Sequence, residues 1–265
     1  MIACKRNVYC LSTKFSCQLI FVASFMEISL AAEKLLTAPV TNSLLTGIIG
    51  SVIIIVLFRL LSARAKLKPS AKQNVSEIII DSFLSLVESI TQNRQKALEF
   101  LPLVLTFFIF ILINNWLGLV PGVGSIGFHE LKEGKEIFVP IFRSANADLN
   151  TTIALALIAV ASIQYFGLKH LRLGYIKKFF DFSGFIPFFV GFLELISEFA
   201  KIISFSFRLF GNVFAGEVLL AVITSLVPII APVPFYGLEI FVGLIQALVF
   251  TMLSIVFMQV ATQRH

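Results

Sequence analysis

Long runs of apolar residues divide this chain, and several of them have the length of a membrane-crossing helix. A helix needs about 20 predominantly apolar residues to cross the hydrocarbon core of a bilayer. The pattern predicts five such helices, with approximate ranges 44–61, 100–119, 149–168, 186–230 and 236–260.

The fourth run is too long for a simple crossing. Some forty helical residues measure about 60 Å at 1.5 Å per residue, about twice the thickness of the hydrocarbon core. We therefore expect this helix either to tilt steeply or to break. Only the loop PIIAPVPFYG separates it from the fifth run, so the last two helices are predicted to form a tilted hairpin.

A sixth segment, QNVSEIIIDSFLSLVESITQNRQKAL, places apolar and polar residues on different sides of a helix. Such a pattern is typical of an amphipathic helix that lies along the membrane surface. Its apolar side contains Val75, Ile79, Phe83, Leu86, Val87 and Ile90. The segment from Gly122 to Asp148, by contrast, reads as a polar loop.

Composition supports this all-α membrane class. Hydrophobic residues make up 58% of the 265 residues, the mean hydropathy is +0.95, and only 14% of residues are charged. A soluble domain would carry roughly a quarter charged residues. The chain is therefore predicted to be an integral membrane protein with five transmembrane helices and one amphipathic surface helix.

Residues 1–25 are set apart from the rest. Basic residues precede an apolar run there, as in a signal-like segment, whereas Met26 begins a stretch that reads like an ordinary protein start. We treat 1–25 as an extension of either kind and 26–265 as a single membrane domain. Cys4, Cys10 and Cys17 all fall within the extension, and their spacing indicates neither a disulfide framework nor a metal site.

The basic residues predict the orientation of the chain. Cytoplasmic loops of membrane proteins carry an excess of Lys and Arg. Eleven such residues follow the first and third helices: Arg59, Arg64, Lys66, Lys68, Lys72, Arg94, Lys96, Lys169, Arg172, Lys177 and Lys178. The opposite side has Lys132, Lys135 and Arg143. The N-terminus is thus expected outside and the C-terminus in the cytoplasm, and the net charge of +6 reflects topology rather than binding of nucleic acid.

Polar residues gather on one face of the fourth helix. At 100° per residue, Glu194, Lys201, Ser204 and Asn212 lie within about 40° of Arg208. An arginine inside a membrane costs about 3 kcal/mol on insertion scales, so it normally faces protein or water. Snorkelling to the interface is the alternative for Arg208, and a cytosolic position on a tilted helix is the alternative for Lys201.

Two further carboxylates belong to the same region. Glu217 lies on the opposite face of the helix from Arg208, about 13 Å further along its axis. In the last helix, Glu239 and Gln246 are seven residues apart and share a face. Glu217 and Glu239 are expected to meet near one end of the helical hairpin. Taken singly, Asn212 and Gln246 also fit a role in interhelical hydrogen bonding.

The segments RLFGNVFAGE and GLIQALVFTMLSIVFM closely resemble subunit a of the F-type ATP synthase, the stator channel subunit. NNWLGLVPG and ADLNTTIALA match signatures around the two middle helices of that family. The resemblance covers about 26–265, whereas residues 1–25 have no counterpart.

The resemblance implies roles for eight residues. Arg208 would face the essential carboxylate of the rotating c-ring, and Glu217 and Glu239 would line the outer half-channel. Asn212 and Gln246 match the polar partners of the arginine region. Glu194, Lys201 and Ser204 fit the inner half-channel.

In the implied mechanism, two offset half-channels carry protons to and from the c-ring, and Arg208 separates them. The chain itself would be non-catalytic, since it contains no GxxxxGK[ST] nucleotide motif. The implied partners are the c-ring, the subunit b peripheral stalk, the remaining subunits and the bilayer, with no cofactor. The AGE triplet favours a bacterial plasma membrane, although organelle relatives exist.

Two functions from other classes serve as alternatives. An ion-coupled secondary transporter would favour inverted repeats and broken helices, and no internal repeat is visible. A haem-bearing respiratory subunit would need axial ligands within the helices. His129, His170 and His265 all lie in predicted loops or tails, so the haem alternative fails.

Overall fold

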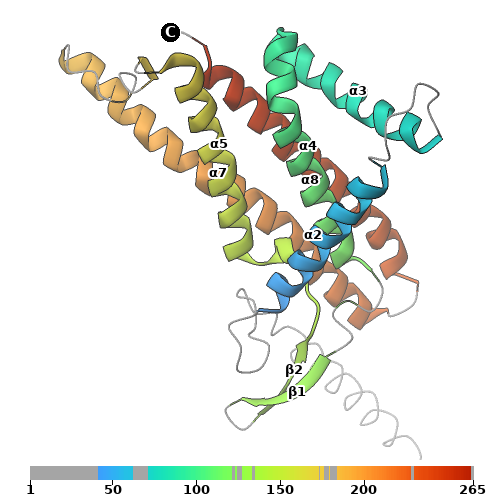
Figure 1. Ribbon diagram of the computed structural model, residues 1–265. Coiled ribbons are helices and arrows are strands. Elements are labelled where there is room, and N and C mark those ends of the chain that lie inside the picture. Colours follow the sequence, from blue (N-terminus) through green and yellow to red (C-terminus); the bar gives the residue numbers. More distant parts are fainter. Residues whose placement is uncertain are drawn as a thin grey trace, which may run out of the picture.

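The computed structural model describes residues 41–61, 71–120, 123, 127–132, 135–172, 174–175, 179, 184–227 and 230–263. Within these ranges the chain is a bundle of long helices with one small β-hairpin (Figure 1). The expectation for residues 1–25 lies outside the described residues and stays a prediction.

Five helices are long and apolar enough to cross a membrane, which confirms the predicted all-α membrane fold. They are α2 (Asn42–Leu61), α4 (Arg94–Gly118), α5 (Leu149–Leu171), α7 (Phe185–Leu226) and α8 (Pro232–Ala261). Helices α2, α5 and α8 begin on the side of the bundle that carries the β-hairpin, which we call the hairpin side (Figure 1). We call the opposite side, where α8 ends, the C-terminal side.

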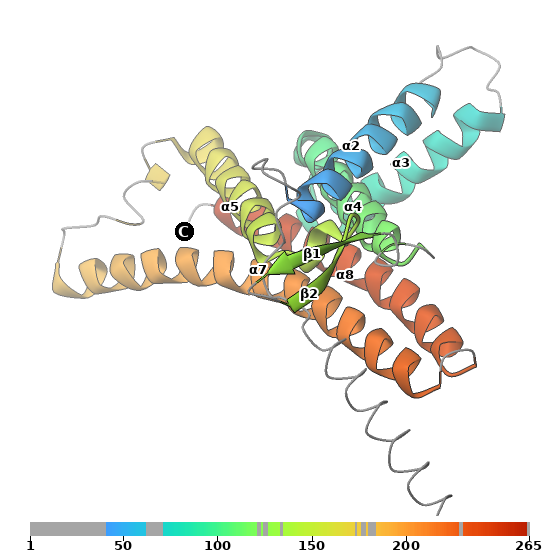
Figure 2. The same cartoon turned by 90° about the horizontal axis from the view of Figure 1, so that it is seen from below.

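Helix α7 runs unbroken through all 42 of its residues, so of the two sequence alternatives the break is excluded. Pro187 falls in the first turn, where a missing N–H costs no hydrogen bond, and the helix ends two residues before Pro228. At 1.5 Å per residue α7 is about 63 Å long. Figure 2 shows it crossing the molecule as one continuous helix that bends near its middle, beside α5 and α8.

Helix α3 (Ala71–Thr91) is the predicted surface helix, and it is not among the helices apolar enough to cross. Its second half packs on the bundle, where Val87 is fully buried. Its first half leaves Val75 and Ile79 exposed, so only part of the predicted apolar side contacts protein.

The segment expected as a polar loop contains regular structure, and that expectation needs correction. Strands β1 (Gly127–Lys132) and β2 (Lys135–Pro140) pair antiparallel, with Gly127 opposite Pro140, and a short 3₁₀-helix, η1, follows at Ala145–Ala147. Alternating apolar positions were too few in this short segment for the period of a strand to stand out.

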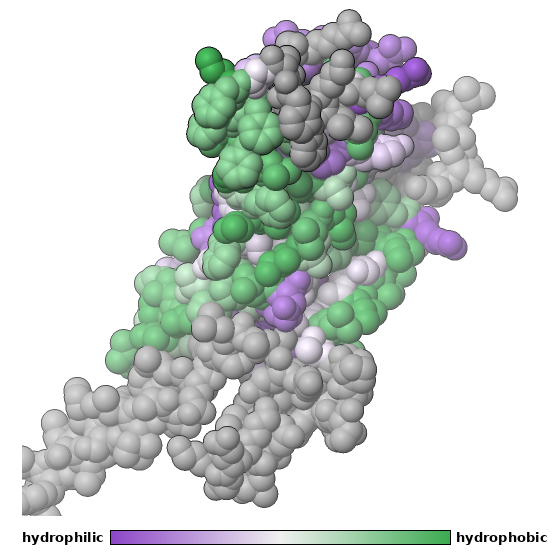
Figure 3. Space-filling model, turned by 90° about the vertical axis from the view of Figure 1, so that its left-hand side faces the viewer, coloured by the Kyte–Doolittle hydropathy of each residue, from purple (hydrophilic) through white to green (hydrophobic). Residues whose placement is uncertain are grey.

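Two apolar clusters hold the bundle together. One lies towards the C-terminal side and joins α3, α4, α5 and α8 around Phe100 and Met258. The other joins α4, α5, α7 and α8 around Phe205 and Phe250, whose rings are 4.7 Å apart. The outer surface is apolar as well: Figure 3 shows hydrophobic side chains across the middle of one face, with hydrophilic ones gathered at its top. A bilayer is the solvent that such a surface fits.

A buried polar network fastens the hairpin side of the bundle. Asn146 of η1 has no exposed surface, and its amide donates to Asn115 Oδ1 of α4 at 2.7 Å. Asn115 in turn donates to the carbonyl of Gly243 in α8 at 3.1 Å. Because Gly243 lacks a Cβ, which would lie 3.2 Å from Asn115 Cβ, α4 and α8 approach closely here. The network fixes η1 against both helices.

We expect Asn146→Leu to destabilise the bundle, because the substitution leaves Asn115 Oδ1 buried without its donor. An unsatisfied buried polar group costs about 1–3 kcal/mol. For a chain of this size that predicts a fall of about 2–12 °C in the midpoint of heat-induced aggregation in detergent. Asn150→Leu is the matched control, because Asn150 is exposed at the start of α5. Equal falls for the two variants would contradict the role of the network.

Candidate functional site

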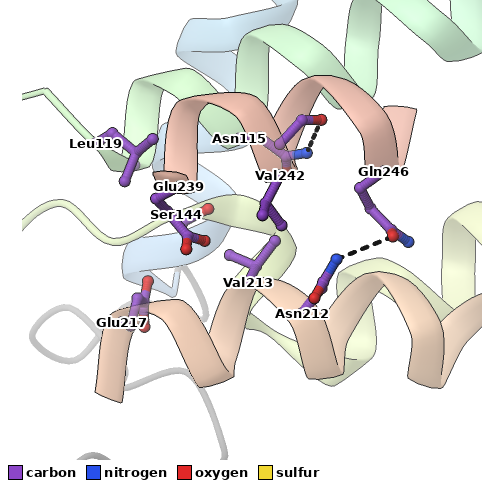
Figure 4. Close-up of a pocket in the computed structure, with 11 residues that line it drawn as sticks. Asn115, Leu119, Ser144, Asn212, Val213, Glu217, Glu239, Val242 and Gln246 are labelled. Carbon is purple, nitrogen blue, oxygen red and sulfur yellow. Dashed lines mark hydrogen bonds between the residues drawn. The ribbon is translucent and has the colours of Figure 1, made fainter. Parts of the chain in front are cut away.

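A cleft on the hairpin side of α7 and α8 brings four of the predicted site residues together. It encloses about 370 Å³, including its open mouth. Glu217 and Asn212 reach it from α7, and Glu239 and Gln246 reach it from α8 (Figure 4). The wall between α4 and η1 adds Asn115 and Ser144. The two carboxylates therefore meet as the helical spacing predicts.

Gly216 makes room for one of these carboxylates. The carboxyl group of Glu239 lies directly against the α7 backbone at Gly216, where any Cβ would overlap all three of its heavy atoms. Glu239 itself has no hydrogen-bond or ion-pair partner within the described ranges. Close packing against the Gly216 backbone therefore positions the Glu239 carboxyl group, and no ion pair within the described ranges does so.

The other carboxylate has a partner that the sequence analysis missed. Arg143, in the segment between β2 and η1, donates from Nε to Glu217 Oε2 at 3.3 Å. Only 10% of the Arg143 side chain and 27% of the Glu217 side chain are exposed. In the sequence, Arg143 stands in a predicted loop and counts only as one of its basic residues. The available signal was that a carboxylate inside an apolar helix needs a nearby cation.

An amide pair lies at the inner end of the cleft. Asn212 Nδ2 donates to Gln246 Oε1 at 3.1 Å, which joins α7 to α8 (Figure 4). Gln246 is 4% exposed, whereas Asn212 is exposed on the outward face of α7. This contact agrees with the interhelical hydrogen-bonding role and keeps both amides beside the carboxylates.

Arg208 lies one helical turn further, and it is exposed on the outward face of α7. Its guanidinium donates to Ser204 Oγ at 3.4 Å. In the part of the chain that the structure describes, no carboxylate lies within ion-pair distance of Arg208. A permanent cation on an apolar face needs an anion or water to compensate its charge, and the described residues supply neither a carboxylate nor another anion.

Lys201 differs from Arg208 although the two share the predicted face. Its ammonium pairs with Glu198 Oε1 at 2.6 Å and lies 4.9 Å from the centre of the Phe257 ring. Both charged side chains are largely buried, with 17% and 13% exposed. Lys201 is therefore neutralised within the protein, and Glu198 is a second residue that sequence analysis missed.

A second cleft lies towards the C-terminal side, between α5 and α7. It encloses about 830 Å³ with its open mouth, and apolar side chains line most of it. Tyr175 donates to Gln164 at 2.7 Å within its wall. Burial, together with the nearby charges of Glu198 and Glu194, raises the pKa of Tyr175 to about 12. The Tyr175 hydroxyl thus stays protonated at neutral pH. Glu194 lies close enough for its charge to influence this hydroxyl.

The eight predicted residues therefore fall into two groups along α7 and α8. Glu217, Glu239, Asn212 and Gln246 surround the cleft on the hairpin side, whereas Glu194 and Lys201 lie towards the other end of α7. Arg208 and Ser204 lie between the groups. Within the described ranges, no cluster of three His, Cys, Asp or Glu side chains has the arrangement of a metal site.

Comparison with known proteins assigns the chain to a family. The family model described as ATP synthase A chain matches residues 44–259. The chain is 34% identical to the chloroplastic ATP synthase subunit a of Stigeoclonium helveticum, over 80% of each protein. It is 35% identical to ATP synthase subunit a of Gloeobacter violaceus over 74% of each. With ATP synthase subunit a of Campylobacter jejuni it is 32% identical over 79% of this chain and 85% of the relative. This multi-pass membrane protein therefore belongs to the ATP synthase A chain family.

Proposed function

We propose that the chain is the proton-translocating stator subunit of a rotary ATP synthase, with two offset half-channels separated by Arg208. The observation that carries the proposal is the exposed guanidinium of Arg208, which faces outward from α7 and has no carboxylate partner among the residues that the structure describes. The essential carboxylate of a c-ring has the charge and the location in the membrane that this face needs. The ATP chemistry would belong to other subunits.

The cleft on the hairpin side is the proposed outer half-channel. Glu239 and Glu217 lie on its walls, nearer to the hairpin side than Asn212 and Gln246 are. Glu239, which has no cation partner among the described residues, would take up a proton from outside and pass it to a ring carboxylate. Asn212 and Gln246 would provide polar contacts at the point of transfer.

The first half of α7 carries the proposed inner half-channel. Glu194 and Ser204 would receive the proton that the ring releases after nearly a full turn. The structure supports a smaller part for Lys201, because Glu198 compensates its charge. We assign Lys201 to the electrostatic balance of this end of α7 rather than to proton transfer.

Arg208 would interact with the ring carboxylate between the two half-channels and would keep the half-channels separate. A protonated ring carboxyl can move through lipid, whereas an ionised carboxylate carries a high cost there unless a cation compensates it. After deprotonation the ring carboxylate would be attracted to Arg208, which does not give up its own proton. The same fixed positive charge would prevent protons from passing directly between the half-channels.

The basic residues and the family suggest the setting. We place the hairpin side outside and the C-terminal side in the cytoplasm of a bacterial membrane, in keeping with the Lys and Arg excess on that side. The c-ring would lie along the exposed face of α7. Contact with the subunit b peripheral stalk is proposed for the exposed part of the N-terminal helices.

Substitution of Arg208 tests the proposal. We expect Arg208→Ala to abolish ATP-driven acidification of inverted membrane vesicles while the complex still assembles, because the ring carboxylate loses its counterion. Passive proton leak should rise if the arginine also acts as the barrier. Arg59→Ala is the matched control, since Arg59 lies in the last turn of an apolar helix. Normal pumping by the Arg208 variant would refute the mechanism and support snorkelling.

Gly216 allows a second test, directed at the outer half-channel. In Gly216→Ala the new methyl group would occupy the place of the Glu239 carboxyl group, which must then move. We expect proton pumping to fall about tenfold or more, since misplacement by about 1 Å can cost that much in a transfer reaction. The control is Gly237→Ala, in the same helix as Glu239, where an added Cβ meets nothing within 4 Å. Equal pumping by both variants would argue against Glu239 as a proton carrier.

A further inference from the structure

We propose that Arg143 is a positioning residue of the proton path, which fixes the Glu217 carboxylate against the wall of the outer cleft and leaves Glu239 as the mobile carrier. The inference rests on the proposed function. It concerns a residue outside α7 and α8, in a segment that sequence analysis treated as a polar loop carrying a topological charge.

The segment that carries Arg143 is held firmly on both sides of η1. Ser144 Oγ donates to the carbonyl of Asn114 at 3.4 Å, and Asn146 donates to Asn115 at 2.7 Å. Asp148 accepts from Ser43 Oγ of α2 at 2.9 Å and caps the start of α5 through the N–H of Asn150. Because these hydrogen bonds hold the backbone of the segment, they limit the movement of the Arg143 guanidinium. Its hydrogen bond then limits the movement of the Glu217 carboxylate on α7.

Burial distinguishes this ion pair from a surface one. Exposed pairs contribute little, because water competes for both charges and both side chains lose entropy. The Arg143 side chain is only 10% exposed, so water competes little for its charge beside Glu217. The charged groups that act on Glu217 are Arg143 from the segment before η1 and Glu239 from α8.

The contrast between the two carboxylates gives them different tasks. Glu217 is tied to a buried cation, whereas Glu239 lies against the bare backbone of Gly216 without an ion pair within the described ranges. Two ionised carboxylates in one partly buried cleft repel each other. With Arg143 compensating Glu217, the cleft can hold one fixed carboxylate and still let Glu239 gain and lose a proton.

A double-mutant cycle in the assembled complex tests the inference. Proton pumping by inverted vesicles would be compared for Arg143→Gln, Arg143→Lys, Glu217→Gln and the double variant Arg143→Gln/Glu217→Gln. We expect Arg143→Gln to lower the rate about tenfold, in line with loss of a charge-assisted hydrogen bond, and Arg143→Lys to recover most of it. The double variant should be no slower than Glu217→Gln alone.

The pH inside the vesicles, which corresponds to the outer side, gives a readout that a packing role would not change. The dependence of the rate on this pH should move by about half a unit or more in Arg143→Gln and stay near wild type in Arg143→Lys. Arg94→Gln is the matched control, because it breaks an exposed Arg–Glu pair, Arg94 with Glu88 at 3.5 Å, far from the cleft. It should pump as wild type.

Several outcomes would overturn the inference. One is a wild-type pumping rate in Arg143→Gln, and another is an unchanged pH dependence in that variant. A third is a double variant whose rate falls by the product of the two single effects, as for independent residues. If Arg143→Gln fails to assemble, the double variant decides, since removing both charges should restore assembly when an uncompensated Glu217 is the cause. Wild-type pumping by Glu217→Gln would instead count against the proposed outer half-channel itself, so the two failures are distinguishable.

Discussion

Charge compensation in a low-dielectric surrounding is the constraint on which this structure depends. Helix α7 carries several ionised side chains through an apolar region, and each uncompensated charge there would cost several kcal/mol. Glu198 compensates Lys201, and Arg143 compensates Glu217. Arg208 is the exception: its contact within the described part of the chain is the Ser204 hydroxyl. Because Lys201 and Glu217 are paired, the lack of a carboxylate partner for Arg208 among the described residues supports a functional role for its side chain.

The packing of the bundle places these charges accurately. Because α7 is a single unbroken helix, the angles between Arg208, Asn212 and Glu217 are set by helical geometry alone. Helix α8 meets α7 through the hydrogen bond between Asn212 and Gln246. It is fastened to α4 by Asn115, which donates to the Gly243 carbonyl, and by Trp116, whose indole donates to the Ile240 carbonyl at 3.2 Å. These backbone contacts fix both the height and the rotation of α8. They also give a physical reason for the polar and aromatic residues of the NNWLG segment. Asn115 and Trp116 of this segment donate hydrogen bonds to backbone carbonyls of α8.

The crossing helices and the meeting of the two carboxylates were predictable from the sequence. The site residues that were missed depend on contacts between side chains in the folded protein. Apolar run length predicted the five crossing helices, and helical spacing predicted that Glu217 and Glu239 would meet. Both properties are local to one or two helices. Arg143 and Glu198 were missed as site residues because their roles depend on which partner a side chain finds. For Arg143 that partner lies 74 residues away in the sequence. The β-hairpin was missed because its strands are six residues each.

The length of α7 bears directly on how two half-channels can be offset. Glu194 and Glu217 are 23 residues apart in one helix, which corresponds to about 35 Å along its axis and exceeds the roughly 30 Å of the hydrocarbon core. If α7 tilts so that 42 residues fit within the membrane, its two ends lie at different positions along the ring as well as at different depths. A ring carboxylate that meets one end cannot meet the other without turning. In the proposed mechanism, Arg208, which is 14 residues from Glu194 and nine from Glu217, then lies where the shortest route between the two half-channels must be closed. In that proposal, an unbroken helix that tilts supplies the lateral offset between the half-channels, and a broken helix with vertical halves would not.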